Sequence, residues 1–212
     1  MKTLISFQNV SLCFDGETLV RDVTFTVSEG MKTILSGKSG TGKTSLVECV
    51  LGFVRPCRGR VSFRGRPVDE SSVWDIRRQI SYVNQDASIG SGRVRDCLDV
   101  CFAFKANRDT ALDEERCGEL LDYFELHPAV MKKRVSELSG GERQRVALVI
   151  ALLLRRNIFI LDEVTASLDT SLKKKVVDLF TGNPAWTVIV VSHDALWQEA
   201  DDVSVYTMEN NV

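Results

Sequence analysis

The stretch 37-GKSGTGKT-44 combines three glycines with a lysine and hydroxyl side chains in a spacing that suits phosphate binding. Glycines allow the backbone to turn its N–H groups inward, where they surround phosphate oxygens. Lys43 brings a positive charge for the β and γ phosphates of a nucleotide, and the Thr44 hydroxyl is suited to Mg²⁺. The predicted phosphate-binding residues are Gly37, Lys38, Ser39, Gly40, Thr41, Gly42, Lys43, Thr44 and Ser45.

The flanking elements place this loop where the chemistry needs it. An apolar strand is expected at 33–36, and a helix is expected from Lys43 onward. The positive end of that helix would point at the bound phosphates. The alternative, a glycine turn that binds no ligand, leaves this arrangement unexplained.

A second candidate site is 158-IFILDE-163, an apolar strand that ends on two acids. Asp162 is predicted to hold Mg²⁺, together with Thr44, because such a strand-terminal acid lies near the phosphate loop in nucleotide-hydrolysing proteins. Glu163 is predicted to act as the general base that polarises water against the γ-phosphate. The alternative is that both acids merely cap the helix that follows.

Strands and helices alternate along the chain. Two strands around the turn Asp15-Gly16 open the sequence, helical patterns dominate from about 92 to 155, and strands are expected at 157–163, 186–192 and 203–211. Several of these strands are apolar throughout, which indicates a parallel sheet covered on both faces. The fold class predicted is therefore α/β with a parallel sheet and a helical insert.

The length, charge and apolar content of the chain limit the classes of function that it can have. The chain has 212 residues, 44% of them apolar, and a formal net charge of −2, so a general nucleic-acid binder is not indicated. The longest aliphatic run, 146-VALVIALLL-154, is about half the length of a membrane span. No signal peptide is recognised at the start, and a reducing cytosol is the expected compartment.

The six cysteines, at positions 13, 49, 57, 97, 101 and 117, form no C-x-x-C pair. The two histidines lie far from most of them, so no metal site is indicated. Cys97 and Cys101 share one face of an expected helix. We expect all six to be buried or idle thiols.

With 138-LSGGERQR-145 and 161-LDEVTASLD-169 in view, the chain resembles the nucleotide-binding domain of an ABC transporter over nearly its whole length. The resemblance implies a P-loop NTPase core with a parallel sheet, an N-terminal antiparallel β-subdomain and an inserted α-helical subdomain. It implies one ABC ATPase domain over 1–212, with the core at 1–85 and 157–212 and the helical subdomain at about 86–156. The implied cofactors are ATP and Mg²⁺.

Two isolated polar residues gain a role from the resemblance. Gln85, at the end of 79-QISYVNQ-85, resembles the Q-loop glutamine that touches Mg²⁺ and the transport partner. His193 resembles the switch histidine that reaches the γ-phosphate. Taken alone, a glutamine or histidine after a strand is more often structural.

A second phosphate-binding element is expected at Ser139, Gly140 and Gly141, just before a helix. In the family, two domains pair head to tail and this segment closes over the ATP held by the partner, with 167-SLD-169 as the D-loop. The resemblance therefore implies a homodimer with two hydrolytic sites, in which Ser139, Gly140, Gly141 and Asp169 contact ATP in trans.

Phe14 stands where the family often stacks a tyrosine on adenine. A phenyl ring also stacks on a purine, and it would enforce ATP over GTP only loosely. The alternative is that Phe14 is a core residue of its strand.

The resemblance also implies a membrane partner. Family members dock a permease near Gln85 and the helical subdomain, so a separate permease subunit and a peripheral location on the cytoplasmic side of the inner membrane are expected. Residues 74–98 resemble export-type proteins more than importers, and the overall likeness is to bacterial two-component exporters, including an iron-export group.

Two other functions were weighed. A soluble ABC ATPase that acts on nucleic acid or ribosomes usually has a long coiled coil or two ATPase domains, and neither pattern is present, so no nucleic-acid partner is expected. The second is a P-loop kinase, which transfers phosphate to a small acceptor. The segment 138-LSGGERQR-145 has no role in that chemistry, so this function is not favoured.

Overall fold

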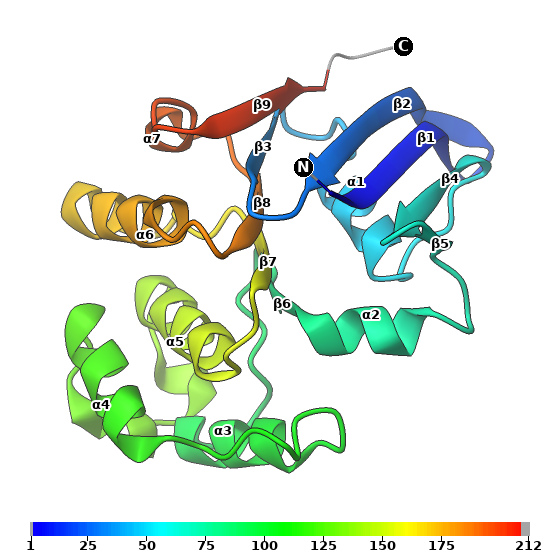
Figure 1. Cartoon of the computed structure of the whole chain (residues 1–212). Coiled ribbons are helices and arrows are strands. Elements are labelled where there is room, and N and C mark those ends of the chain that lie inside the picture. Colours follow the sequence, from blue (N-terminus) through cyan, green and yellow to red (C-terminus); the bar gives the residue numbers. More distant parts are fainter. Residues whose placement is uncertain (1, 209–212) are drawn as a thin grey trace.

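Two β-sheets and the helices around them make up the part of the chain that the computed structural model describes, residues 2–208 (Figure 1). The strands are β1 Thr3–Phe14, β2 Glu17–Ser28, β3 Lys32–Ser36, β4 Arg58–Phe63, β5 Arg66–Pro67, β6 Ile80–Val83, β7 Ile158–Asp162, β8 Thr187–Val191 and β9 Val203–Thr207. The helices are α1 Lys43–Val50, α2 Val73–Gln79, α3 Val94–Ala103, α4 Glu114–Tyr123, α5 Gly140–Leu153, α6 Thr170–Gly182 and α7 Ala195–Gln198, with 3₁₀ turns η1 Pro128–Lys132 and η2 Val135–Glu137.

The central sheet is parallel, and within residues 2–208 its strand order is β6-β7-β8-β3-β9. Successive side chains of a strand point to opposite faces, and β7 shows the result. Phe159 and Leu161 pack on the side of α5 and α6, whereas Ile158 and Ile160 pack with α1 and the antiparallel sheet. Both faces are buried, so the strand reads as a continuous apolar run, as the sequence predicted.

The second sheet is antiparallel, with the order β2-β1-β4-β5 in the described part of the chain. Phe14 pairs with Glu17, so Asp15 and Gly16 form a two-residue hairpin turn. Both turn residues have positive φ, 49° and 85°, which is the conformation that an Asp-Gly pair favours. The turn and the antiparallel N-terminal region are confirmed.

The helical region lies between β6 and β7 in the chain and contains α3, α4, the two 3₁₀ turns and α5. Figure 1 places it to one side of the parallel sheet, away from the antiparallel sheet. The α/β class with a helical insert is therefore confirmed. Three short elements, α2, β5 and α7, were not predicted. The expected last strand is β9, and positions 209–211 of the prediction lie outside the described residues.

The expectation of six free thiols is wrong for one pair. Cys13, near the end of β1, and Cys57, just before β4, form a disulfide across a sequence separation of 44 residues. Pairing of the two strands is the reason, because the Cys57 N–H donates to the Ser11 carbonyl at 2.9 Å and brings the two Cα atoms to 5.9 Å. The remaining cysteines are free, and of these Cys101 is the half-buried one.

Among residues 2–208, every helix falls short of the length and apolar character that a membrane crossing requires.

Candidate active site

The phosphate loop joins β3 to α1 directly. Gly37, Gly40 and Gly42 all have positive φ, so the loop curls in a way that residues with side chains rarely adopt. At Gly37 an added Cβ would lie 2.6 Å from the Met208 carbonyl oxygen, which leaves no room for any other residue. The Lys43 ammonium spans the loop and donates to the carbonyls of Gly37 and Lys38 at 2.9 and 2.7 Å.

Asp162 lies directly beneath the loop at the end of β7. Its Oδ2 accepts a hydrogen bond of 2.8 Å from the Thr44 hydroxyl, and its Oδ1 is buried without a hydrogen-bond partner among the described residues. Burial raises the pKa of the Asp162 carboxyl to about 6, with a smaller contribution from the charge of Glu163, while the Thr44 bond opposes the shift. A buried carboxylate with an unpartnered oxygen fits a cation.

The oxygen ligands present suit Mg²⁺. This ion usually takes one or two protein oxygens and completes its shell with water and nucleotide phosphates. Thr44 and Asp162 supply such oxygens, and Gln85 lines the same phosphate pocket as Thr44. Within residues 2–208 no group of three His, Cys, Asp or Glu side chains could hold a metal without the nucleotide. When bound, Mg²⁺ would neutralise phosphate charge.

Glu163 and His193 meet at the carboxyl end of the parallel sheet. The distance between His193 Nδ1 and Glu163 Oε1 is 2.9 Å, and the histidine side chain is 75% exposed. Glu163 has a φ of 50°, a conformation that costs free energy for a residue with a side chain. Its N–H donates to the Val191 carbonyl, which ties this bend to β8. This hydrogen-bonded bend places Glu163 in the lining of the phosphate pocket.

One pocket of about 550 Å³ brings most of the predicted residues together. Its lining includes Gln85, Glu163 and His193 beside the phosphate loop. Thr41 is buried under the loop and donates to the Lys38 carbonyl. Sequence reasoning missed three residues that also line this pocket, Leu19, Ala166 and Val191. Leu19 lies on β2 and approaches Gly42, a contact that depends on how the hairpin folds back and leaves no signal in the sequence.

Phe14 does not line this pocket. It stands 42% exposed beside the hairpin turn, so it is not a core residue of β1. Its stacking on adenine stays a prediction.

Ser139 begins α5 as its N-cap. Its Oγ accepts from the Glu142 N–H at 3.1 Å, and Glu142 Oε2 accepts from the Ser139 N–H, which is a capping box. The helix is 14 residues long, and its N-terminus is not part of the phosphate pocket of the same chain. An added Cβ on Gly141 would lie 2.9 Å from the Ser167 carbonyl oxygen, whereas at Gly140 the nearest atom is 3.7 Å away. Close backbone packing therefore requires the second glycine.

Asp169 caps α6. Its Oδ1 accepts from the N–H groups of Ser171 and Leu172, both at 3.0 Å, and these bonds lower the pKa of its carboxyl. The in-trans role of Asp169 stays a prediction beside this capping role.

The comparisons with known proteins agree with this geometry. Residues 20–166 match the family described as ABC transporter. The chain belongs to the ABC transporter family. The iron importer subunit "Fe(3+) ions import ATP-binding protein FbpC 2" of Rhodococcus jostii is 34% identical over 205 residues, which is 92% of this chain and 56% of the relative.

Other relatives have names that give other kinds of transport system. "Energy-coupling factor transporter ATP-binding protein EcfA1" of Enterococcus faecalis is 31% identical, over 92% of this chain and 72% of its own length. An "ATP-dependent lipid A-core flippase" of Xanthomonas euvesicatoria is 32% identical, over 96% of this chain and 36% of its own length. The chain thus spans about half the length of the iron-import relative.

Two solved structures share the fold. A bacterial ABC exporter with ATP bound has a TM-score of 0.84 at 20% identity, covering 99% of this chain and 38% of that one. A bacterial ABC transporter cassette in a dimeric structure has a TM-score of 0.81 at 24% identity, covering 96% and 94%. At these identities the likeness concerns the fold.

The buried carboxyl of Asp162 predicts a pH-dependent stability. Its pKa of about 6 lies above the value near 4 of an unfolded chain, so between these values the unfolded state releases the proton first. The free energy of unfolding therefore falls as pH rises from 4 to 6 and stays lowered above that. In metal-free buffer, Asp162→Asn should raise the free energy of unfolding by roughly 2 kcal/mol at pH 8 and by about a third of that near pH 4.5, as measured by urea unfolding.

The exposed Asp178→Asn is the matched control and should change neither value. An equal gain from Asp162→Asn at both pH values would contradict the role given to burial of this carboxyl.

Proposed function

We propose that the chain is the ATP-hydrolysing subunit of an ABC transporter. The observation that carries the proposal is the single pocket in which the phosphate loop faces Gln85, Glu163 and His193. A nucleotide bound through its phosphates would have a lysine, a metal site and a carboxylate base around one phosphorus atom.

Each residue has a part in the proposed reaction. The loop N–H groups and Lys43 hold the β and γ phosphates, while Thr44, Asp162 and Gln85 hold Mg²⁺. Water attacks the γ-phosphorus, the bond to the bridging oxygen breaks, and ADP and phosphate leave. Glu163 accepts the proton of the attacking water, and His193, 2.9 Å from Glu163, positions that carboxylate beside the γ-phosphate.

Two copies complete the site within this proposal. Ser139, Gly140 and Gly141 open a 14-residue helix whose N-terminus lies outside the pocket of its own chain. Such a helix end attracts phosphate. In a head-to-tail homodimer this end, with Asp169, would face the ATP held by the other chain.

The rate of phosphate release at saturating Mg²⁺ and ATP tests this proposal. The rate per chain should fall as the protein is diluted, because monomers hold incomplete sites. A rate per chain that stays constant down to nanomolar protein would contradict the paired site, and an absence of phosphate release at every concentration would contradict the ATPase itself.

The partner we propose is a separate membrane permease, which docks near Gln85 and the helical region and holds the chain at the cytoplasmic face of the membrane. The relatives named as ATP-binding proteins of iron import and of an energy-coupling factor transporter support a transport role. Export is the proposed direction, on the resemblance of residues 74–98 to export-type proteins. Transport of a labelled cargo by the chain and its permease in vesicles would reveal the direction.

A further inference from the structure

A disulfide ties the N-terminal hairpin to the neighbouring strand β4. Cys13 lies near the end of β1, one residue before Phe14, and Cys57 lies just before β4. Both cysteines are exposed, so a thiol in solution can reach the bond between them. Exposed disulfides are reduced more readily than buried ones, and they are frequently regulatory. This bond is therefore suited to reversible opening.

The backbone around Cys57 is held firmly without the disulfide. The Cys57 N–H donates to the Ser11 carbonyl at 2.9 Å. An added Cβ on Gly59 would lie 2.2 Å from the Asn9 carbonyl oxygen, so the start of β4 is packed closely on β1. We expect this end of the disulfide to stay in place when the bond opens.

The backbone around Cys13 is held less firmly. Pairing between β1 and β4 ends at Ser11, and beyond that point Cys13 pairs with β2. A hairpin of two strands is marginally stable by itself. Leu12 and Val20 are buried at the base of this hairpin, so opening the disulfide would loosen residues 13–19 and leave the base in place.

The same hairpin forms part of the phosphate pocket. Leu19 lines the pocket, and an added Cβ on Gly42 of the phosphate loop would lie 3.3 Å from Leu19 Cδ2. Phe14, whose stacking on adenine is predicted, lies on the first strand of the hairpin and is 42% exposed. A change in the order of the hairpin would therefore be felt by a bound nucleotide.

We propose that Cys13 and Cys57 form a reversible thiol–disulfide switch that sets the affinity for ATP. With the bond closed, the hairpin is preorganised beside the pocket and ATP binds more tightly. With the bond open, ATP has to order the hairpin and binds more weakly. The switch rests on the proposed function, which supplies ATP as the ligand and a cytoplasmic location where thiols are kept reduced. Disulfides that form in such a compartment are usually transient and redox-sensing.

The co-reactant in this exchange is a dithiol reductant. One of its thiolates attacks a sulfur of the pair, forms a mixed disulfide and releases the other cysteine as a thiolate, which takes up a proton. The second thiol of the reductant loses its proton and displaces the first cysteine, which is protonated in turn. The chain gains two electrons and two protons, and the reductant leaves as a disulfide. Closure is the reverse exchange with a disulfide oxidant.

Nucleotide titration of the wild-type chain in both redox states tests the switch. The chain is equilibrated with dithiothreitol or with glutathione disulfide, and its free thiols are counted after unfolding, with six expected when the pair is open and four when it is closed. We expect the Kd of a fluorescent ATP analogue to rise by about three- to tenfold on reduction. The rate of hydrolysis at saturating ATP should change by less than about twofold, because Glu163 and His193 lie outside the hairpin.

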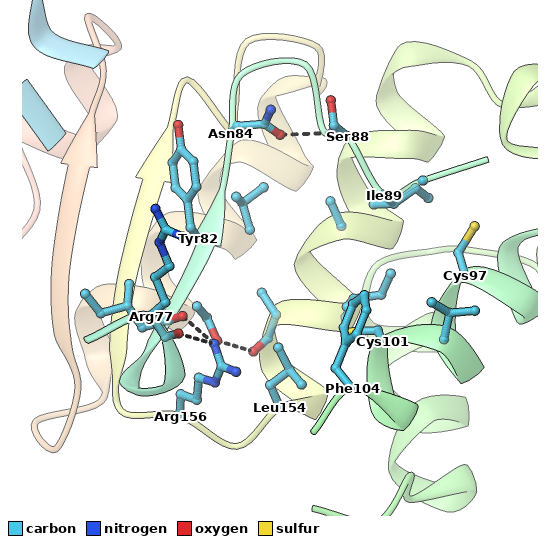
Figure 2. A pocket seen from close by; sticks show the side chains of 18 of the residues that line it. Arg77, Tyr82, Asn84, Ser88, Ile89, Cys97, Cys101, Phe104, Leu154 and Arg156 are labelled. Carbon is cyan, nitrogen blue, oxygen red and sulfur yellow. Dashed lines mark hydrogen bonds between the residues drawn. The ribbon is translucent and has the colours of Figure 1, made fainter. Parts of the chain in front are cut away.

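Replacement of both cysteines separates the disulfide from other effects of the reductant. The double variant Cys13→Ser, Cys57→Ser should bind ATP like the reduced wild-type chain in both buffers. Cys101→Ser is the matched control and should keep the full response. Cys101 is a free, half-buried thiol that lines a separate cavity of about 720 Å³ between β6, α3 and α5 (Figure 2).

Hydrogen exchange locates the change within the chain. On reduction, the amides of residues 13–19 should exchange faster, whereas those of β4 should exchange at the same rate. Thermal melting of each sample verifies that the chain remains folded.

A Kd that is unchanged in chains with six free thiols would overturn the proposal, and so would a pair that stays closed in dithiothreitol. A lower melting temperature on reduction with an unchanged Kd would also overturn it and leave the disulfide a stabilising role. ATP that is bound and hydrolysed with the same Kd in both states refutes the switch alone. Absence of ATP binding in both states refutes the proposed function, and exchange at residues 13–19 then still decides whether the disulfide orders the hairpin.

Discussion

Glu163→Gln should lower the rate of ATP hydrolysis by about 10²–10⁴-fold while ATP still binds, because the amide cannot accept the proton of the attacking water. The amide oxygen can still accept a hydrogen bond from His193, which lies 2.9 Å from Glu163 Oε1 in the wild-type chain. ATP that is bound and not cleaved should hold two copies together. Phosphate release and size-exclusion chromatography with ATP measure the two effects.

Glu199 is the exposed residue that caps the C-terminal end of α7, and it does not line the phosphate pocket. Glu199→Gln is therefore the matched control and should hydrolyse ATP at the wild-type rate. Near wild-type turnover of Glu163→Gln would remove this residue from the mechanism. A variant that fails to turn over but also stays monomeric with ATP would leave the base in place and contradict the paired site.

Gly140→Asp should abolish cooperative hydrolysis without unfolding the chain. The added Cβ would meet no atom closer than 3.7 Å, and an acid in the first turn of α5 is favourable to the helix itself. Its negative charge would nevertheless face the phosphates held by a second copy, and such repulsion costs several kcal/mol, or about 100-fold in rate or more. ATP binding to the monomer should persist, as measured by fluorescent-nucleotide titration.

Gly118→Asp is the matched control, because Gly118 is an exposed glycine of α4 with open space around its Cβ position. It should hydrolyse ATP normally. Wild-type hydrolysis by Gly140→Asp would mean that the start of α5 does not approach phosphate.

Local patterns in the sequence were sufficient to predict the main elements of the fold. Alternation around Asp15-Gly16 predicted the hairpin, and the continuous apolar runs predicted β7 and β8. The short helices α2 and α7 were not recognised because seven and four residues are too few for a helical period to stand out. The Cys13–Cys57 disulfide depends on the pairing of β1 with β4, strands far apart in the sequence.

Site residues that belong to compact sequence motifs could be predicted from the sequence. Site residues that reach the pocket through tertiary contacts could not. The phosphate loop and the Asp162-Glu163 pair are local patterns, whereas Leu19 reaches the pocket through hairpin packing. The raised pKa of Asp162 follows from burial, which no motif records. The cavity of about 720 Å³ between β6, α3 and α5 is lined by segments far apart in the sequence, so it became visible only in the folded chain.

The pairing of two copies is tested most directly by mixing two inactive variants. Lys43→Ala should fail to hold its own ATP but keep an intact α5 start, and Gly140→Asp should have the opposite defect. In a head-to-tail pair of the two, one site joins the intact phosphate loop of one chain to the intact helix start of the other. Equal amounts mixed with Mg²⁺ and ATP should therefore regain activity well above the sum of the separate samples, up to about a quarter of the wild-type rate per chain. A mixture no more active than that sum would contradict the account.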